Sequence, residues 1–328
     1  MKGSIKKTVA LLCAAIFFTL TLTSCVGSDK YEINISVLSG STGFGAAQLI
    51  SDTSHGQTHE GYGFTVENDA SLITSALISG EVDIAALPTN AAAALYNKTD
   101  GKIKIAAVNT LGVLYVLTSD ETITTLADLE GRTVYAPAQN PAFIFEAICR
   151  ENGLISGENI TIDTAYSAPA DLRAALLSDK VDVAVLPEPM VTIALSANPS
   201  LRVAIDLTDE WEKSFGKNTL MQGCIVVRTE WAEQNPDKLE KFLADYKKSV
   251  QFTVDEPKKA AHCIVEVGIF AGKAEIAEAA IPKCNIKYID GEEMSAGLNQ
   301  FFEILYSVAP QAVGGRIPDD GIYVQDKD

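Results

Sequence analysis

Short apolar strands and amphipathic helices alternate along most of the chain. Residues 33–38 alternate apolar and polar side chains, which predicts a strand, and residues 46–51 follow with a helical pattern. Asp69 is a plausible N-cap for a helix over Ala70–Ser79, and Gly80 is the glycine expected just after its end. Strand–helix alternation favours an α/β fold with largely parallel sheets. Further strands are predicted at 64–66, 82–87, 103–109, 113–118, 133–135, 161–164, 181–186 and 224–228, and helices at 90–97, 141–152, 170–178, 236–254, 260–271, 274–280 and 292–309.

One segment of this pattern occurs twice. Residues 73–88 and 172–187 each contain a helix, a tight turn, the dipeptide Val-Asp, an apolar strand and a final proline, in register. The recurrence predicts two similar α/β lobes. The strands at 113–118 and 224–228 lie at the edges of the second unit, where the chain would cross between lobes. The helical tail after Pro236 is expected to pack on the first lobe.

The N-terminus has the layout of a secretory signal peptide. Three lysines precede an apolar run over residues 9–22, and small residues then lead to Cys25. Leu22-Thr23-Ser24-Cys25 resembles the lipobox of bacterial lipoproteins, in which the cysteine is acylated and becomes the first residue. The alternative is an uncleaved membrane helix, but ~14 residues span about 21 Å, less than a hydrocarbon core of ~30 Å. We therefore expect an extracytoplasmic protein held at the membrane by lipid on Cys25.

These patterns divide the chain into a signal peptide, a tether and two lobes. The chain carries 26 basic and 43 acidic residues, and the signal segment removes three lysines and no acids. Strong acidity disfavours nucleic acid and anionic lipid surfaces as partners. The boundaries are 1–24 for the signal peptide, 25–30 for the tether, 31–112 with 224–328 for the first lobe, and 113–223 for the second.

The cysteines and histidines give no sign of a catalytic centre or a cofactor. Cys149 lies in a helical apolar stripe and Cys224 in a strand, so both are expected in the core. Cys263 and Cys284 either pair in an oxidising compartment or stay as free buried thiols. His55 and His59 have a spacing seen in metal sites, but glycines flank this segment, and a solvated loop is the favoured interpretation.

In order along the chain, several short motifs resemble those of type II periplasmic-binding-protein-like solute receptors of ABC importers. The likeness covers about residues 31 to 260 and is greatest for the nitrate, sulfonate and thiamine-precursor branch. It implies two doubly wound α/β lobes joined by two strand crossings, with a ligand cleft between them. It also implies capture of a small polar molecule by cleft closure and delivery to permease subunits, by a monomer without enzymatic activity, on the outer face of a Gram-positive cell. The motifs are Gly80-Glu81-Val82-Asp83-Ile84-Ala85, Leu87-Pro88-Thr89-Asn90, Ala107-Val108-Asn109-Thr110-Leu111-Gly112, Leu126-Ala127-Asp128-Leu129-Glu130-Gly131-Arg132-Thr133 and Val185-Leu186-Pro187-Glu188-Pro189.

The candidate ligand-binding residues follow strands of the predicted sheets, because such folds bind ligands outside the carboxyl ends of their strands. Helix starts there offer backbone N–H groups to a polar ligand, although ordinary N-capping explains the same residue types. Glu188, between two prolines, either pairs with a ligand nitrogen in the cleft or lies on a solvated rim. The candidates are Ser41, Thr42, Gly43 and Phe44 after the first strand, Thr89 and Asn90, Gln139 and Asn140, Glu188, and, near the crossings, Asn109, Thr110 and Gln222.

Together these residues suggest a ligand with both acceptor and basic groups, such as a sulfonate, a thiamine-precursor-like molecule or another polar heterocycle. Two other functions stay open. A sensor subunit would pass the ligand signal to a membrane receptor instead of a permease. A secreted enzyme on the same fold is disfavoured, because the cysteine-rich iron motif of the thiamine-pyrimidine branch is absent and no Ser-His-Asp constellation is placed.

Overall fold

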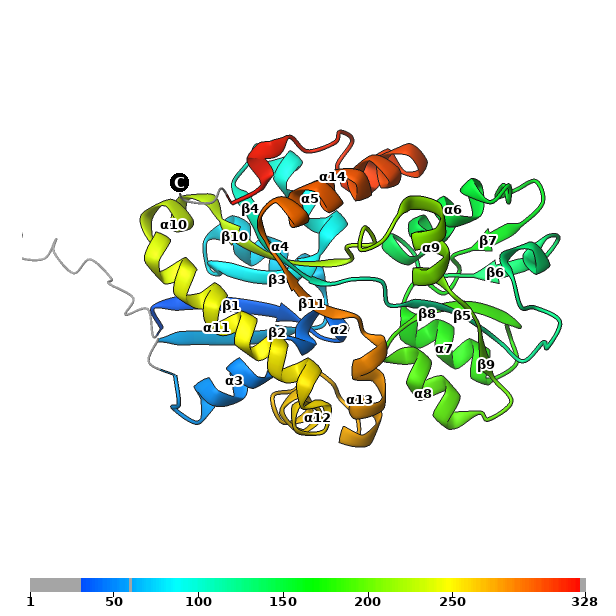
Figure 1. Cartoon of the computed structure of the whole chain (residues 1–328), viewed down its shortest axis with the longest axis horizontal. Coiled ribbons are helices and arrows are strands. Elements are labelled where there is room, and N and C mark those ends of the chain that lie inside the picture. Colours follow the sequence, from blue (N-terminus) through cyan, green and yellow to red (C-terminus); the bar gives the residue numbers. More distant parts are fainter. Residues whose placement is uncertain (1–30, 59–60, 325–328) are drawn as a thin grey trace, which may run out of the picture. The chain divides into compact units, whose positions relative to one another are not determined.

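The computed structural model describes residues 31–58 and 61–324. The signal peptide, the tether with Cys25, and His59 lie outside the described residues, so the predictions made for them stay predictions. The described residues from Ile33 onward belong to one compact unit, which contains two sheets with helices on their faces (Figure 1).

The first sheet has six strands in the order β11-β4-β10-β3-β1-β2. β1 runs parallel to β2 and β3, whereas β10 is antiparallel to both β3 and β4. The strands are β1 (Ile33–Leu38), β2 (Tyr62–Glu67), β3 (Ile84–Pro88), β4 (Ile103–Thr110), β10 (Gly223–Arg228) and β11 (Ile286–Ile289).

The second sheet has five strands in the order β7-β6-β8-β5-β9. β6 is parallel to β7 and β8, and β5 is antiparallel to β8 and β9. The strands are β5 (Leu114–Thr118), β6 (Thr133–Tyr135), β7 (Thr161–Asp163), β8 (Val183–Pro187) and β9 (Arg202–Asp206).

The two strands next to the crossings differ from expectation. We expected largely parallel sheets, yet β5 and β10 each lie inside a sheet and run antiparallel to their neighbours, so both sheets are mixed. A strand that enters a sheet from the other sheet arrives at the carboxyl edge and therefore runs in the opposite direction. All five residues of β5 are buried, and a continuous apolar run is typical of a strand covered on both faces.

Most predicted helices are present within a few residues of their expected bounds. Asp69 accepts a hydrogen bond from the Ser71 N–H, and Gly80 has φ 82°, which confirms both ends predicted for α4. Not predicted were α2, α8, α9, α10, β9 and β11. The helices are α2 (Ser41–Phe44), α3 (Ala47–Ser54), α4 (Ala70–Ser79), α5 (Thr89–Thr99), α6 (Asn140–Glu151), α7 (Pro169–Leu177), α8 (Met190–Ala197), α9 (Leu207–Phe215), α10 (Thr229–Gln234), α11 (Pro236–Asp255), α12 (Pro257–Glu266), α13 (Ala274–Ala280) and α14 (Gly291–Val308), with short 3-10 helices η1 (Leu126–Leu129), η2 (Ile281–Lys283), η3 (Pro310–Val313) and η4 (Asp320–Ile322).

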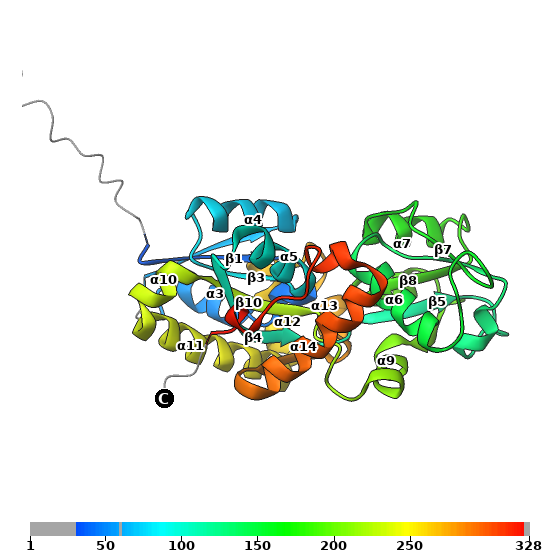
Figure 2. The same cartoon turned by 90° about the horizontal axis from the view of Figure 1, so that it is seen from above.

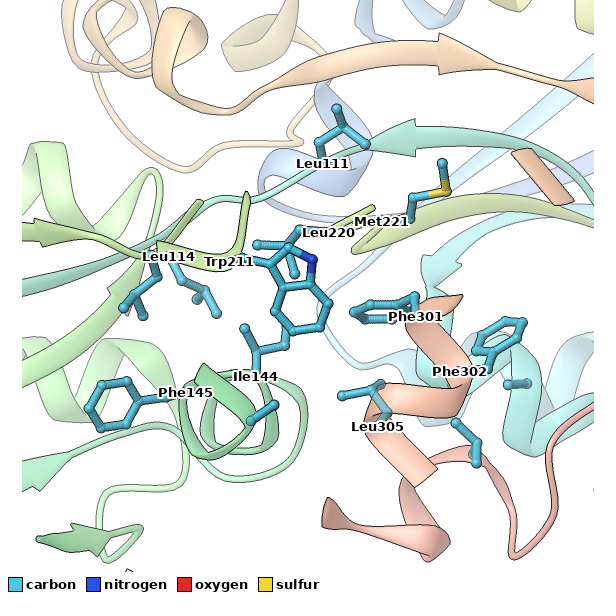
Figure 3. Close-up of a cluster of buried hydrophobic side chains, with 14 of the residues drawn as sticks. Leu111, Leu114, Ile144, Phe145, Trp211, Leu220, Met221, Phe301, Phe302 and Leu305 are labelled. Atoms are coloured by element: carbon cyan, nitrogen blue, oxygen red, sulfur yellow. The ribbon is translucent and has the colours of Figure 1, made fainter. Parts of the chain in front are cut away.

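The C-terminal helices do not all pack as predicted. α11 and α12 pack on α3 beside the first sheet, whereas α14 contacts α6 on the second sheet (Figure 2). Buried apolar side chains hold α14 in this position. Phe301 on α14 and Trp211 on α9 belong to one buried cluster (Figure 3), and their ring centroids are 5.7 Å apart. α14 also contacts β4, so it packs on both sheets, whereas we expected the tail to pack on the first lobe alone.

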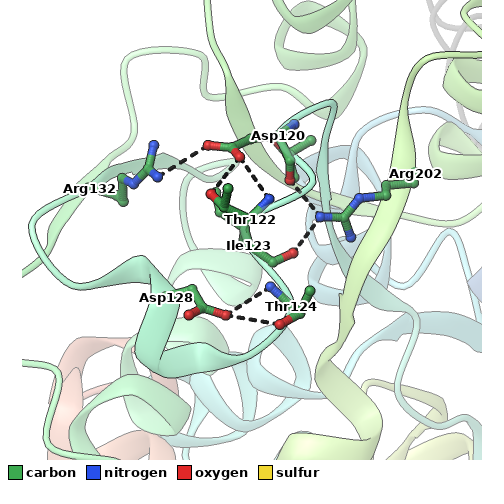
Figure 4. Close-up of polar contacts among 8 residues, drawn as sticks. Asp120, Thr122, Ile123, Thr124, Asp128, Arg132 and Arg202 are labelled. Atoms are coloured by element: carbon green, nitrogen blue, oxygen red, sulfur yellow. Dashed lines mark hydrogen bonds and ion pairs between the residues drawn. The ribbon is translucent and has the colours of Figure 1, made fainter.

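The motif at 126–133 has a structural explanation. Thr125 and Asp128 form a capping box around η1, and the Asp128 carboxylate also accepts bonds from the N–H and hydroxyl of Thr124 (Figure 4). These bonds lower the pKa of Asp128 to about 2. Arg202 Nη2 donates to the carbonyl oxygens of Asp120 and Ile123, which fixes the preceding turn. The motif thus shapes a turn after β5.

The four cysteines of the described region are free thiols. Cys149 and Cys224 are buried in the core, as predicted, and Cys263 and Cys284 do not form a disulfide. Within the described ranges, no helix is both long and apolar enough to cross a bilayer.

Candidate functional site

The predicted site residues gather at the carboxyl edges of the two sheets. In the first sheet β1, β3 and β4 run in the same direction and lead into α2, α5 and the first crossing. In the second sheet β6 and β8 run parallel and lead into α6 and α8. The Glu188 N–H donates to the carbonyl of Val113 in the first crossing (3.0 Å), so the end of β8 lies beside the chain that joins the sheets.

The two crossings are bonded to each other and to the start of α5. The Gln222 N–H donates to the Thr110 carbonyl (2.9 Å), and the Gln222 carbonyl accepts from the Thr89 N–H (3.0 Å). The Gln222 side-chain oxygen accepts from the Val113 N–H (2.8 Å). Gln222, predicted as a residue on the hinge side, therefore fastens one crossing to the other. The structure brings Thr89, Thr110 and Gln222 together.

Asn109 has every polar atom of its amide occupied. Its Nδ2 donates to the Thr42 carbonyl and to the Tyr246 hydroxyl, both at 3.0 Å, and its Oδ1 accepts from the Thr110 hydroxyl at 3.0 Å. The side chain is 1% exposed. Asn109 therefore holds the start of α2 against β4 and α11, which is a positioning role, and its contact with a ligand stays a prediction. Tyr246 was missed, because in the sequence it is one more apolar position of a long amphipathic helix.

The segment after β1 is a helix and not a loop. Ser41 and Thr42 begin α2, a single turn whose N-cap Gly40 has φ 87°. A Cβ on Gly43 would collide with the Leu38 carbonyl, so glycine is required there for backbone packing. The Phe44 ring is fully buried and contacts Phe270 edge to face at 6.5 Å. Phe44 is thus a core residue, and its contact with a ligand stays a prediction.

Two helices present buried polar atoms with no partner, one helix on each sheet. Asn90 in α5 and Asn140 in α6 are 7% and 8% exposed, and the Oδ1 of each has no hydrogen-bond partner among the described residues. The hydroxyl of Thr89 is buried with only the weakly bonding thiol of Cys224 beside it. No side chain of the described region caps either helix, and neither first turn contains an acidic residue. Buried polar atoms rarely stay unpaired in native proteins, so the amide oxygens of Asn90 and Asn140 stand out as candidates for bonding to a ligand.

Burial rules out one of the two interpretations of Glu188, and its pairing with a ligand nitrogen stays a prediction. The carboxylate is 2% exposed, so it does not lie on a solvated rim. It also caps α8, because Oε2 accepts from the Thr192 N–H (3.1 Å) and Oε1 from the Thr192 hydroxyl (2.9 Å). Burial raises the pKa of Glu188, and the two bonds from Thr192 and the charge of Lys283 oppose that rise. The carboxylate is thus engaged in helix capping.

Other predicted groups are not joined to this network. No hydrogen bond within the described residues links Gln139 or Asn140 to the residues of the first sheet; Gln139 precedes α6 with φ 68°. Cavities of about 430 Å³ and 350 Å³ lie elsewhere, beside α7 and between α3 and α11, and contain none of the predicted residues. His55 Nε2 lies 3.5 Å from Glu266 Oε1, and the described residues include no group of three or more metal-ligating side chains.

Solved structures with the same arrangement include proteins linked to transport. An ABC transporter structure from Parabacteroides distasonis has 28% identity and a TM-score of 0.76, covering 91% of this chain and 100% of that chain. The periplasmic aliphatic sulphonate-binding protein SsuA of Escherichia coli has 17% identity and a TM-score of 0.69, with coverage of 86% and 95%. A Candida albicans gene product described as having the generic periplasmic binding protein fold has 15% identity and a TM-score of 0.59, with coverage of 88% and 92%. The fold implied by the sequence resemblance, the periplasmic-binding-protein fold, is therefore confirmed.

A search of curated protein sequences found no match. The profile of the NMT1/THI5-like family matches residues 63–260, which is more than half of the chain. On this evidence, the chain belongs to the NMT1/THI5-like family.

Proposed function

We propose that this protein is an extracytoplasmic solute-binding lipoprotein, and not an enzyme. It captures a small polar organic molecule between the carboxyl edges of its two sheets and delivers it to the permease subunits of an ABC importer. Cleft closure accompanies capture, and lipid on Cys25 holds the protein at the membrane. The family and the transport-linked neighbours of the same fold support this proposal.

The unpartnered amide oxygens of Asn90 and Asn140 carry the proposal. They begin helices on different sheets, and both helices are long enough to have a strong positive N-terminal end. A ligand that bonds to both would supply the missing partners and would favour the state in which both amides reach it. Such a ligand needs a polar group at each end, because each helix start offers both N–H donors and an amide oxygen.

Mass spectrometry of the small molecules that co-purify with the protein, after release by denaturation, tests this function. We expect one dominant polar molecule from the parent, and its loss from a variant carrying both Asn90→Ala and Asn140→Ala. Asn68→Ala, an exposed asparagine before α4, is the matched control and should retain the molecule. A parent without any bound molecule, which also fails to bind in a screen of polar metabolites, would contradict the proposal.

The lipid anchor is tested separately. In a host that processes lipoproteins, Cys25→Ser should release the protein to the medium or leave its precursor uncleaved, because the acylated thiol is gone. Membrane fractionation and intact-mass measurement decide this. Full membrane retention of a cleaved product that has no lipid mass would contradict the role of Cys25.

A further inference from the structure

The rear of α5 is fastened to the segment that follows α14. Asn97, in the last turns of α5, donates from Nδ2 to the carbonyl oxygens of Val313 and Arg316, both at 2.7 Å. Arg316 Nε returns a bond to Asn97 Oδ1 at 3.1 Å. The Asn97 amide therefore bonds through both its nitrogen and its oxygen to a segment more than 200 residues away in the sequence, and Asn97 is only 9% exposed to solvent.

α14, which precedes that segment, is hydrogen-bonded to α6 and α9 beside the second sheet. Arg150, near the end of α6, donates from Nη1 to the Ser307 carbonyl at 3.2 Å. Gln300 on α14 donates from Nε2 to the Phe215 carbonyl at the end of α9, at 2.6 Å. Residues 291–319, named here the C-terminal strap, thus contact the rear of both helices whose starts carry Asn90 and Asn140.

An apolar contact stiffens the strap on the side of the second sheet. Trp211 is fully buried, and its ring centroid lies 4.5 Å from that of Phe215 and 5.7 Å from that of Phe301. Figure 3 shows the rings of Trp211 and Phe301 beside each other. Gly297 of α14 packs against the Met221 side chain in the second crossing, where a Cβ would collide with Met221. Close packing of this kind permits a few discrete arrangements, not a continuous range.

From these contacts we infer that the C-terminal strap positions α5 and α6 relative to each other and thereby sets the separation of the two halves of the site. Arg150 and Gln300 are positioning residues, because they act on the site through the rear ends of helices and not by touching ligand. The inference rests on the proposed function in one respect, because it takes the starts of α5 and α6 to be the ligand site. The strap adds a third connection between the lobes beside the two crossings.

Distances between spin labels on the two lobes test the strap without any ligand. Labels are placed at Ser79→Cys on α4 and Ser178→Cys after α7, both exposed, in a Cys263→Ser background, since the remaining cysteines of the described region are buried. The full chain is compared with and without the paired substitutions Arg150→Ala and Gln300→Ala. Glu303→Ala, exposed on the same helix, is the control.

We expect the width of the distance distribution to increase about two-fold in the paired variant, at an unchanged circular dichroism spectrum, and to stay constant in the control. The same centre and width in all three proteins would overturn the inference. If the paired variant does not fold, Gln300→Ala alone is measured, with the same two outcomes. If no small molecule binds to the parent protein, the proposed function is contradicted. The distance measurement still tests the role of the strap, because it is made without ligand.

Discussion

The starts of α5 and α6 differ from the start of α8 in the way their polar groups are satisfied. All three helices follow strands at a carboxyl edge. At α8 the chain supplies its own carboxylate, Glu188, which accepts both the N–H and the hydroxyl of Thr192. At α5 and α6 no described side chain does so, and the amide oxygens of Asn90 and Asn140 are unpaired. A helix end filled from within has a structural role, whereas an open one is available to a ligand.

A second contrast separates two buried asparagines at the same edge. Asn109, near the end of β4, makes three hydrogen bonds, whereas Asn90 Oδ1, just after β3, makes none. An amide with all its bonds made stabilises the fold, and an unpaired one costs stability unless a ligand completes it. The following variants test both contrasts.

The largest expected effect is on Asn109. Asn109→Ala leaves the Thr42 carbonyl and the Tyr246 hydroxyl without partners inside the core. We expect the free energy of unfolding to fall by about 2–4 kcal/mol, since each buried unpaired group costs about 1–3 kcal/mol. Urea denaturation of parent and variant measures it. A loss under about 1 kcal/mol would contradict the view that the three hydrogen bonds of Asn109 stabilise the fold.

Substitution of the unpaired asparagines should affect binding and spare stability. In Asn90→Ala with Asn140→Ala, affinity for the co-purified molecule should fall by about 30- to 100-fold, equivalent to about 2–2.7 kcal/mol. The free energy of unfolding without ligand should not fall, because no bond to either Oδ1 is lost and two unpaired buried oxygens are removed. Isothermal titration and urea denaturation measure the two quantities. A large stability loss with unchanged affinity would reverse the comparison with Asn109.

Thr192→Val tests the filled helix start. The substitution removes the hydroxyl donor to Glu188 Oε1 and preserves the N–H donor to Oε2. We expect a loss of about 1–2 kcal/mol in unfolding free energy, as for a bond to a buried charged group. Ligand affinity should change by less than about three-fold if α8 has only a structural role. A much larger loss of affinity would return Glu188 to the ligand site.

The smallest effect concerns pH. Burial raises the pKa of Glu188 above its unfolded value, so the folded state binds a proton more readily than the unfolded state. Its contribution should therefore favour folding as pH falls from neutral through the raised folded pKa, and the gain is complete below the unfolded pKa of about 4.5. Glu188→Gln should remove this gain, because the amide does not titrate. Urea denaturation of both proteins between pH 7.5 and pH 4.5 measures it, and identical pH profiles would contradict it.

The local structure was predictable because its signals are local. Asp69 and Gly80 mark both ends of α4, and the duplicated segment at 73–88 and 172–187 gives α4 with β3 and α7 with β8. Short elements without a clear period, such as α2 and β11, were missed. The asparagines at the starts of α5 and α6 were predicted from their place after strands, although the role of a ligand there stays a proposal.

The sequence by itself determined the fold class, the alternation of strands and helices, and the family motifs, because residues near one another in the chain carry these signals. Tertiary structure alone decided which polar atoms are occupied. Asn109 is completed by Thr42 and Tyr246, 67 and 137 residues away, and α14 reaches α6 through Arg150 and Ser307, 157 residues apart. Hydrogen-bond satisfaction depends on groups that only folding brings within about 3 Å, and no local pattern encodes which partner arrives.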